Sequence, residues 1–456
     1  MSKQPFSDLD AYVANHREAF EADLRRLVEI PTVSMDPAHK PDIERGAKAA
    51  AEILRQGDGK ARVVPTKGNP IIVGELLSDP KHPWITVYNH MDVQPADEPT
   101  WKSDPFVMQI QNDKYIGRGS TDDKGPGLTA LYAARYARDH GVPLNVRFLW
   151  EMEEEIGSPS FEGMVKAELP SLRTDSVLVS DTIWIAKGRP AVPYGLRGVQ
   201  GLTIRLETGA KNTHSGLTGG PARNPVAELA GLVAKMMDPA TGRVKIPGFY
   251  DDVRKLTKKE KDGFAASGFN VARYKKAHEL KSLRFDDPMA IMQRIMALPT
   301  FEVHGISGGY HGPGVKTVVP SWAEVKISCR LVPDMKASKV MHLIRGFVKK
   351  QLPDAQVAEE HHLEWFLGEI SGPHAEAATK ALRFGFGRAP AFVREGGSIG
   401  AVVTMARAFK CPLVMIGLSL PEHGYHAPNE NYDWEQASGG MKTFVKYFDE
   451  VSRIGR

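Results

Sequence analysis

The chain has 456 residues, of which 42% are hydrophobic and 25% are charged, a composition that is ordinary for a globular protein and unlike a disordered, collagen-like or repeat sequence. Because a single hydrophobic core usually stops growing at about 250–300 residues, this length predicts two domains. The 59 lysines and arginines outnumber the 55 acidic residues only slightly, a net charge of +4 that predicts binding neither to nucleic acid nor to a membrane surface.

The first part of the chain alternates between helical spacing and short apolar runs. Helices are expected over residues 8–30 and 43–56 and in a third segment that ends at Gly141, and strands over 71–73, 85–88, 146–150 and 176–179. Such alternation predicts an α/β fold with a mixed, mostly parallel sheet flanked by helices.

The pattern changes near Gly198, where residues 201–209 alternate apolar and polar side chains as a half-buried strand does. Further strand-like and helical runs follow in the order β-α-β-β-α-β, which predicts a ferredoxin-like α+β domain. We place this lid or dimerisation domain at residues 198–368, inserted into a discontinuous catalytic domain of residues 1–197 and 369–456. Residues 239–290 fit neither pattern and are expected to elaborate the inserted domain, partly as helix.

Two cysteines, Cys329 and Cys411, lie in apolar strand-like segments, so neither a disulfide framework nor a cysteine-ligated zinc site is expected. No run approaches the ~18 apolar residues that a membrane span needs, and the polar start of the chain lacks the apolar core of a signal peptide. We therefore expect a cytoplasmic protein in which histidines and carboxylates would have to hold any metal.

Potential metal ligands follow four of the strand-like runs. These are His90 and Asp92, then Glu151, Glu153, Glu154 and Glu155, then Asp181, then His423 and His426. The segment "GRGSTDDKG" adds Asp122 and Asp123 ahead of a helix. Since ligands bind beyond the carboxyl ends of strands in open α/β sheets, these side chains are expected to converge.

A convergence of carboxylates is favourable only around a multivalent cation. Imidazole and carboxylate ligands suit zinc, manganese or cobalt, and more than four of them indicate two ions that share a bridging carboxylate. Each motif alone has an ordinary explanation, such as a surface His-x-Asp pair, a solvated run of glutamates or an aspartate that caps a helix. Spacing alone does not choose among the glutamates, or between His423 and His426.

Eight motifs, in chain order, carry a family resemblance: "HMDVQP", "GRGSTDDKGP", "EEEIGS", "SDT", "HSGLTGG", "RLVP", "EGGSI" and "GYHAPNE". They resemble the dinuclear-metal peptidases that include carnosinases, cytosolic nonspecific dipeptidases, aminoacylases, glutamate carboxypeptidases and succinyl-diaminopimelate desuccinylases. The resemblance covers nearly the whole chain and is weakest over residues 239–290. It implies two divalent ions per subunit, with zinc expected first and manganese or cobalt as alternatives.

The resemblance also implies roles for individual residues. By position, the metal ligands are His90, Asp122, Glu155, Asp181 and His426, with Asp122 as the bridging carboxylate ahead of a cis peptide bond. Asp92 resembles the carboxylate that orients His90, and Glu154 resembles the general base. Glu154 would take a proton from a metal-bridging water, whose hydroxide attacks the scissile carbonyl, and pass the proton to the leaving amine.

Substrate contacts are implied in the same way. His214 resembles the histidine that stabilises the oxyanion from the partner subunit, which implies a homodimer through the inserted domain, although action within its own subunit stays open. Arg330 resembles the arginine that grips a substrate carboxylate. Gly396, Gly397 and Ser398 resemble the substrate-binding loop.

Three alternatives stay open at this point. The segment "GGSIG" also matches a nucleophile elbow, so a serine hydrolase that uses Ser398 and His426 competes, although it leaves the carboxylates unexplained. A second alternative is a metal-binding module without catalysis. Glu154 argues against this alternative, because the resemblance assigns Glu154 to proton transfer rather than to holding an ion. Within the family the motifs are most similar to carnosinase-like dipeptidases, which implies dipeptide substrates, and deacylation of N-acyl amino acids is the third alternative.

Overall fold

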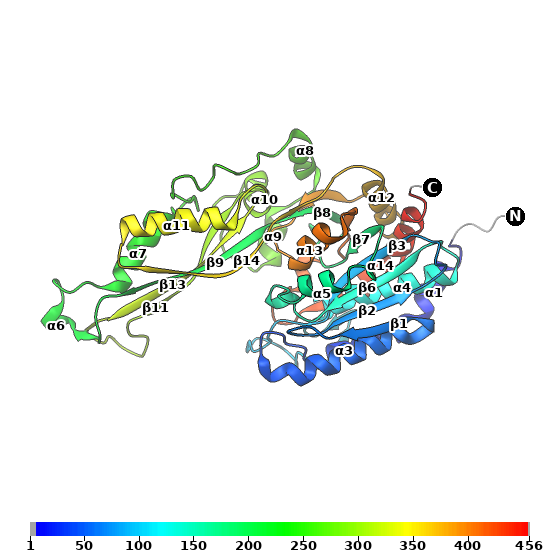
Figure 1. Ribbon diagram of the computed structural model, residues 1–456, viewed down its shortest axis with the longest axis horizontal. Coiled ribbons are helices and arrows are strands. Elements are labelled where there is room, and N and C mark those ends of the chain that lie inside the picture. The colour runs from blue at the N-terminus through cyan, green and yellow to red at the C-terminus, as the bar shows by residue number, and fades with distance from the viewer. Residues whose placement is uncertain (1–5, 455–456) are drawn as a thin grey trace.

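The computed structural model describes residues 6–454, which form a larger α/β part and an elongated smaller part (Figure 1). The outermost residues of the predicted catalytic domain, 1–5 and 455–456, lie outside the described residues. A six-stranded sheet of order β1-β2-β6-β3-β7-β17 forms the centre of the larger part. Its strands are β1 (Lys60–Val64), β2 (Ile71–Leu76), β3 (Trp84–His90), β6 (Asn145–Glu151), β7 (Ser176–Val179) and β17 (Leu413–Met415).

This sheet is mixed, as the sequence predicts. The pairs β3–β6, β3–β7 and β7–β17 are parallel, whereas β1–β2 and β2–β6 are antiparallel. Helices cover both faces, so β3 sends Val87 into one apolar core and Tyr88 into the other. The first core involves α2 (Arg17–Val28), α3 (Lys40–Arg55), α4 (Gly125–Asp139), α12 (Pro373–Phe386) and α14 (Trp434–Val451), and the second involves α5 (Phe161–Glu168) and α13 (Gly400–Phe409).

Two details of the larger part differ from the sequence-based expectation. The single helix expected over residues 8–30 is two helices, α1 (Leu9–Asn15) and α2, that meet at His16. Several short strands had no clear apolar run, among them β1, which is mostly exposed, and the small sheet of β4 (Gln109–Gln111), β5 (Lys114–Ile116) and β18 (Asn431–Asp433). No helix in the described part of the chain is long and apolar enough to cross a membrane.

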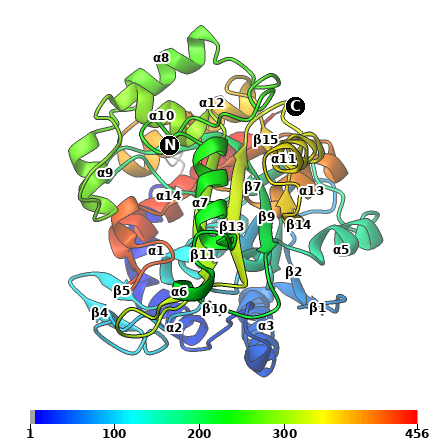
Figure 2. The same ribbon diagram turned by 90° about the vertical axis from the view of Figure 1, so that its left-hand side faces the viewer.

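The smaller part is an antiparallel four-stranded sheet of order β11-β13-β9-β14, with α7 (Pro225–Met236) and α11 (Ala337–Gln351) packed on one face (Figure 2). Its strands are β9 (Gly198–Glu207), β11 (Thr300–Gly308), β13 (Trp322–Leu331) and β14 (Gln356–Leu363). The order of elements confirms the predicted ferredoxin-like unit. The domain limits at residues 198 and 368 stay a prediction.

Residues 239–290 pack only partly as expected: Val244, Ile246 and Phe249 join the core of the smaller part, whereas the helical region that follows contacts the larger part. They contain α8 (Lys258–Ala266) and α9 (Val271–Ala277) and lead into α10 (Pro288–Met296). Phe264 and Met292 pack with Ala191 and Val393, in β8 (Ala191–Leu196) and β16 (Ala391–Arg394) of the larger part. With β15 (Phe366–Leu367), β8 and β16 form the three-stranded sheet through which the chain passes into and out of the smaller part.

Candidate active site

The predicted ligands meet at one edge of the central sheet. Because β6, β3, β7 and β17 are parallel neighbours, their carboxyl ends lie side by side. His90 is the last residue of β3, and Asp181 follows β7 by two residues. The turn η4 (Glu154–Ile156) follows β6, and the segment after β17 leads through η5 (Pro421–His423) to His426.

Two groups of ligand atoms share one carboxylate. The groups are His90, Asp122 and Asp181, and Asp122, Glu155 and His426; the atoms within each group lie within 4.8 Å of one another. Nε2 of His90 is 2.9 Å from Oδ1 of Asp122, and Nε2 of His426 is 3.1 Å from Oδ2 of Asp122. The geometry therefore brings all five predicted ligands together, with Asp122 between the two histidines.

The backbone around Asp122 is held by a residue to which the sequence analysis gave no role. The carboxylate of Glu430 accepts hydrogen bonds from the backbone N–H groups of Gly119, Thr121 and Asp122 at 2.9–3.0 Å and pairs with Arg118 at 2.9 Å. The Asp122–Asp123 peptide is cis, as the resemblance implies. The only signal for Glu430 was its place as the last letter of "GYHAPNE", because its partners are more than 300 residues away in the chain.

Asp92 contacts both sides of the site. Its Oδ1 is 3.4 Å from Nδ1 of His90, although that nitrogen makes its hydrogen bond with the Asp92 carbonyl oxygen at 3.0 Å. The two carboxylate oxygens also accept hydrogen bonds from the backbone N–H groups of Glu154 and Glu155. Asp92 thus holds the η4 turn and also lies beside the imidazole of His90.

The ligand groups attract positive charge strongly. Burial lowers the pKa of His426, but its contacts with Asp122 and Glu155 outweigh this effect and raise the pKa to about 11. Burial raises the pKa of Asp122, but hydrogen bonds with His426 and His90 hold it below its usual range. Burial, with the charges of Asp122 and Glu155, raises the pKa of Asp181 to about 7. The carboxylates around the two histidines thus make a site that favours positive charge, as a divalent cation would supply.

The residues fit a pair of metal ions. Oδ2 of Asp122 is buried and makes no well-formed hydrogen bond, and Nε2 of His426 lies 3.1 Å from it, so both atoms are placed to bind one cation. The donors are imidazole nitrogens and carboxylate oxygens, the set that zinc, manganese and cobalt accept. His426 adopts φ +54, in the left-handed region that few residues other than glycine occupy, and such outliers cluster at functional sites.

The contacts of the four glutamates after β6 distinguish their roles, which spacing in the sequence could not do. Glu151 accepts hydrogen bonds from the hydroxyls of Tyr88 and Ser158, and Glu153 accepts them from the backbone N–H groups of Asn69 and Ser160. Glu155 belongs to a ligand group, whereas Glu154 stands beside both groups and in neither. Burial, with the charges of Asp181 and Glu155, raises the pKa of Glu154 well above its usual value against the opposing effect of His90.

The contacts of His423 and His426 also distinguish the roles of these two histidines. The Nε2 atom of His423 lies 3.2 Å from Asp433, and its Nδ1 atom lies 3.0 Å from the hydroxyl of Thr121. His423 is therefore a buried packing residue whose hydrogen bonds are satisfied, and His426 faces the carboxylates.

The predicted substrate residues form a second cluster. Nη1 of Arg330, on β13 of the smaller part, donates to Oγ of Ser398 at 2.9 Å, and that hydroxyl donates to the carbonyl of Arg197. Within residues 6–454 no histidine contacts Ser398, so the serine-hydrolase alternative lacks a base. An ideal Cβ at Gly400 would lie 3.1 Å from the carbonyl oxygen of Gly157, which places this loop against the turn that carries Glu154.

A cavity of about 760 Å³ adjoins these residues. Its lining includes Glu395, Gly396, Gly397 and Tyr425, whose hydroxyl lies 3.3 Å from Asp181. Other lining residues come from the α9 and α10 region, among them Phe269, Tyr274 and Met296. Residues 239–297 thus contribute to the candidate site, a role that the sequence analysis did not assign to them.

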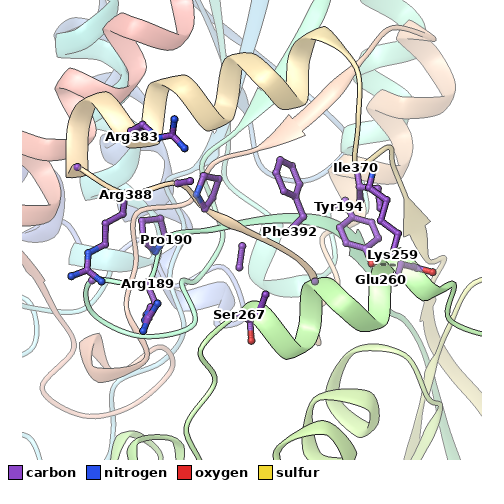
Figure 3. Close-up of a pocket in the computed structure, with 17 residues that line it drawn as sticks. Arg189, Pro190, Tyr194, Lys259, Glu260, Ser267, Ile370, Arg383, Arg388 and Phe392 are labelled. Carbon is purple, nitrogen blue, oxygen red and sulfur yellow. Dashed lines mark hydrogen bonds between the residues drawn. The ribbon is translucent and has the colours of Figure 1, made fainter.

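A separate cavity of about 680 Å³ lies between α8, α12 and β16 (Figure 3). Arg189 and Arg388 line one end, and Tyr194 and Glu260 line the other. None of the predicted site residues lines it.

His214 is the one predicted residue that the fold keeps apart. It is the exposed second residue of β10 (Thr213–His214) and caps α6 (Ser215–Thr218), which lies at the end of the smaller part remote from the sheet edge (Figure 1). Within one chain it therefore does not join the ligand groups.

Comparison with known proteins agrees with this architecture. Residues 86–450 match peptidase family M20/M25/M40. The chain is 30% identical to the Cys-Gly metallodipeptidase dug1 of Schizosaccharomyces pombe, over 99% of each chain, and 30% identical to human Beta-Ala-His dipeptidase, over 97% of this chain and 92% of the relative. The solved structure of the dipeptidase Dug1p from Saccharomyces cerevisiae superposes with a TM-score of 0.89 at 28% identity, over 99% of each chain. The chain belongs to peptidase family M20/M25/M40.

Proposed function

We propose that the protein is a metal-dependent dipeptidase. The observation that carries the proposal is the sharing of Asp122 by two groups of potential ligands, with Glu154 close to members of both groups and part of neither. The names of its relatives, a Cys-Gly metallodipeptidase and a Beta-Ala-His dipeptidase, support dipeptides as the substrate class.

Two metal ions would be held by the two ligand groups. His90, Asp122 and Asp181 would bind one ion, and Asp122, Glu155 and His426 would bind the other, with zinc expected and manganese or cobalt as alternatives. Bound ions would supply Lewis-acid polarisation and make water more acidic.

Glu154 would act as the general base. A carboxyl group with a raised pKa can take a proton from the attacking water and return it to the leaving amine. Arg330 would hold the carboxylate of the substrate through its guanidinium, and Ser398 would orient that guanidinium through their hydrogen bond. Asp92 would keep Glu154 in place through the backbone of η4.

The proposal includes a homodimer in which His214 serves the site of the partner. The remote position of His214 supports this arrangement, and two large apolar side chains near it, Leu217 at 85% exposure and Val315 at 94%, support a covered surface there. Mixing a His214→Ala subunit with a Glu154→Gln subunit would restore part of the activity, since one site in each mixed dimer would be complete. A monomer in solution, or no recovery on mixing, would contradict the shared site.

A substrate panel tests the proposed activity. The metal-free protein would be reloaded with zinc or manganese and offered free dipeptides, N-acetyl amino acids and N-succinyl amino acids. Cleavage of dipeptides with either metal supports the proposal, whereas cleavage of acyl amino acids alone would assign it to the deacylases. A cytoplasmic location is also proposed, because Cys329 and Cys411 are both free thiols, as in reducing compartments.

A further inference from the structure

Glu395 carries a carboxylate that has no charged partner. It is the residue between β16 and the loop glycines Gly396 and Gly397, and it lines the 760 Å³ cavity with them. Its Oε2 atom is buried and has no hydrogen bond. Across residues 6–454 no lysine, arginine or histidine lies within ion-pair distance of it.

The nearest basic side chains are committed elsewhere. Arg394 points its guanidinium at Glu260, with Nε 3.0 Å from Oε1 of that residue. Arg330 donates to Ser398, and Nε of Arg197 donates to the carbonyl oxygen of Gly396 at 2.9 Å. Glu395 is also absent from both ligand groups. The fold therefore supplies no cation for this carboxylate.

A buried ionised carboxylate without a counter-charge is unfavourable. Burial and the nearby Asp181 raise the pKa of Glu395 to about 8, although the backbone N–H of Ile183 opposes the change. A bound cation would reverse this cost. Gly397 leaves space beside the carboxylate, since an ideal Cβ there would lie 4.0 Å from Oε1.

A dipeptide brings such a cation at the end opposite its carboxylate. Two residues of extended chain span about 7 Å, and the three steps from Glu395 to Ser398 span at most about 10 Å. One short loop can therefore present a carboxylate to the amino end of a dipeptide and, through Ser398 and Arg330, a guanidinium to its carboxyl end. An N-acyl amino acid has no ammonium group to place there.

We propose that Glu395 binds the free ammonium group of the substrate and so selects dipeptides over N-acyl amino acids. This inference rests on the proposed dipeptidase function and adds the group that recognises the amino end. It makes Glu395 a specificity-determining residue, because the chemistry of bond cleavage does not need it.

The test compares Ala-Leu with N-propanoyl-leucine, which has the same skeleton with hydrogen in place of the amine. The wild-type holoenzyme is expected to cleave Ala-Leu with a kcat/KM at least about 100-fold higher, the size of effect that pairing a buried charge gives. Glu395→Gln should raise the KM for Ala-Leu by about 30- to 100-fold with a smaller change in kcat. Its kcat/KM for N-propanoyl-leucine should stay within about threefold of wild type.

Two further measurements separate recognition from a structural role. Glu369→Gln removes an exposed carboxylate outside the cavity and should leave both substrates unaffected. In a Glu154→Gln background, in which turnover is slow, calorimetry should detect Ala-Leu binding that the added Glu395→Gln change weakens by a similar factor. Metal content and melting temperature should match the parent protein in each case.

The outcomes distinguish the two proposals. Equal cleavage of both substrates by the wild-type enzyme would leave the dipeptidase proposal standing and overturn the role of Glu395, and this comparison needs no variant to fold. A Glu395→Gln enzyme that loses both substrates equally would also overturn the role. Failure of the wild-type enzyme to cleave any free dipeptide, with cleavage of N-propanoyl-leucine, would reject both proposals.

Discussion

The carboxylate of Asp92 holds the backbone of Glu154, whose N–H donates to Oδ1 of Asp92 at 3.2 Å. The next N–H, that of Glu155, donates to Oδ2 at 3.1 Å. Since Oδ1 also lies 3.4 Å from Nδ1 of His90, one buried side chain links two proposed metal ligands and the proposed base. The sequence separates Asp92 from the two glutamates by 62 and 63 residues, and the pairing of β3 with β6 brings them together.

Asp92→Asn should therefore impair the site more than the fold. The amide keeps one acceptor oxygen but turns an N–H₂ group toward the second backbone N–H, so the η4 turn should shift. We expect kcat/KM to fall by about 10- to 100-fold, with weaker metal binding, as for other groups that orient ligands. Steady-state kinetics and chelator competition measure both effects. Asp97→Asn, at an exposed position outside the site, should match wild type.

Glu154→Gln and Glu153→Gln test neighbouring carboxylates with different contacts. Glu154→Gln should lose about 10²- to 10⁴-fold in kcat while it retains its metal, because the amide cannot carry a proton. Glu153→Gln weakens hydrogen bonds from two backbone N–H groups and should lower the melting temperature more than kcat. Metal analysis, kinetics and thermal melts of both variants check this. The reverse pattern would reassign the base.

His426→Ala and His423→Ala should affect different properties. His426→Ala removes a ligand from the second group, so that group should lose its ion. His423→Ala breaks hydrogen bonds to Thr121 and Asp433 and should cost about 1–3 kcal/mol of stability, with both ions retained. Metal-to-protein ratios after dialysis decide between them. Loss of an ion from the His423 variant alone would mean that the motif was aligned incorrectly.

Removal of metal should abolish activity and destabilise the protein. Ions that bind only the folded state stabilise it by about 4 kcal/mol at a concentration 1,000 times their Kd. Treatment with a strong chelator should therefore lower the melting temperature along with kcat, and zinc or manganese should restore both. Activity that survives complete metal removal would support the alternative of a serine hydrolase that uses Ser398.

Glu260→Gln should weaken the docking of α8 on β16 in a pH-dependent way. Burial raises the pKa of Glu260, but hydrogen bonds from the backbone of Thr257 and from Arg394 outweigh this and lower it below its usual value. The ion pair therefore stabilises the protein above about pH 4.5, and its contribution is lost as the pH falls through the folded-state pKa.

At pH 7 the Glu260→Gln variant should lose about 3–5 kcal/mol, since Arg394 is left buried without a counter-charge. Urea unfolding at pH 7 and at pH 4 measures the difference, which should shrink at the lower pH. Glu44→Gln, on the exposed face of α3, serves as the control. A difference that does not change with pH would show that the ion pair is not its source.

Much of the fold was predictable because its signals are local. The apolar runs of β3, β6 and β7 are buried on both faces and so read as continuous, and the alternation of Leu202, Ile204 and Leu206 gave the half-buried strand β9. β1 could not be seen in this way, because most of its residues are exposed. The break between α1 and α2 also lacked a signal, since no proline or glycine marks His16.

The candidate site also has features that local sequence signals predict and features that they do not. Strand ends and motifs predicted which side chains would converge, and the structure brings His90, Asp122, Glu155, Asp181 and His426 together. Spacing alone could not choose between His423 and His426, because both follow the same strand. The motif resemblance selected His426, and the tertiary contacts agree with that choice. Glu430 binds partners that are more than 300 residues away in the chain, and Glu395 is distinguished by the lack of a charged partner. Neither property can be predicted from a local sequence pattern.

The hydrogen bonds of Glu430 also join two segments that the ribosome makes far apart in time. Asp122 precedes this anchor by 308 residues, and His426 likewise emerges late. A nascent chain on the ribosome could thus complete its central strands while the bridging aspartate still lacked its support. Completion of the proposed two-ion site would then await the final segment, which supplies both His426 and Glu430.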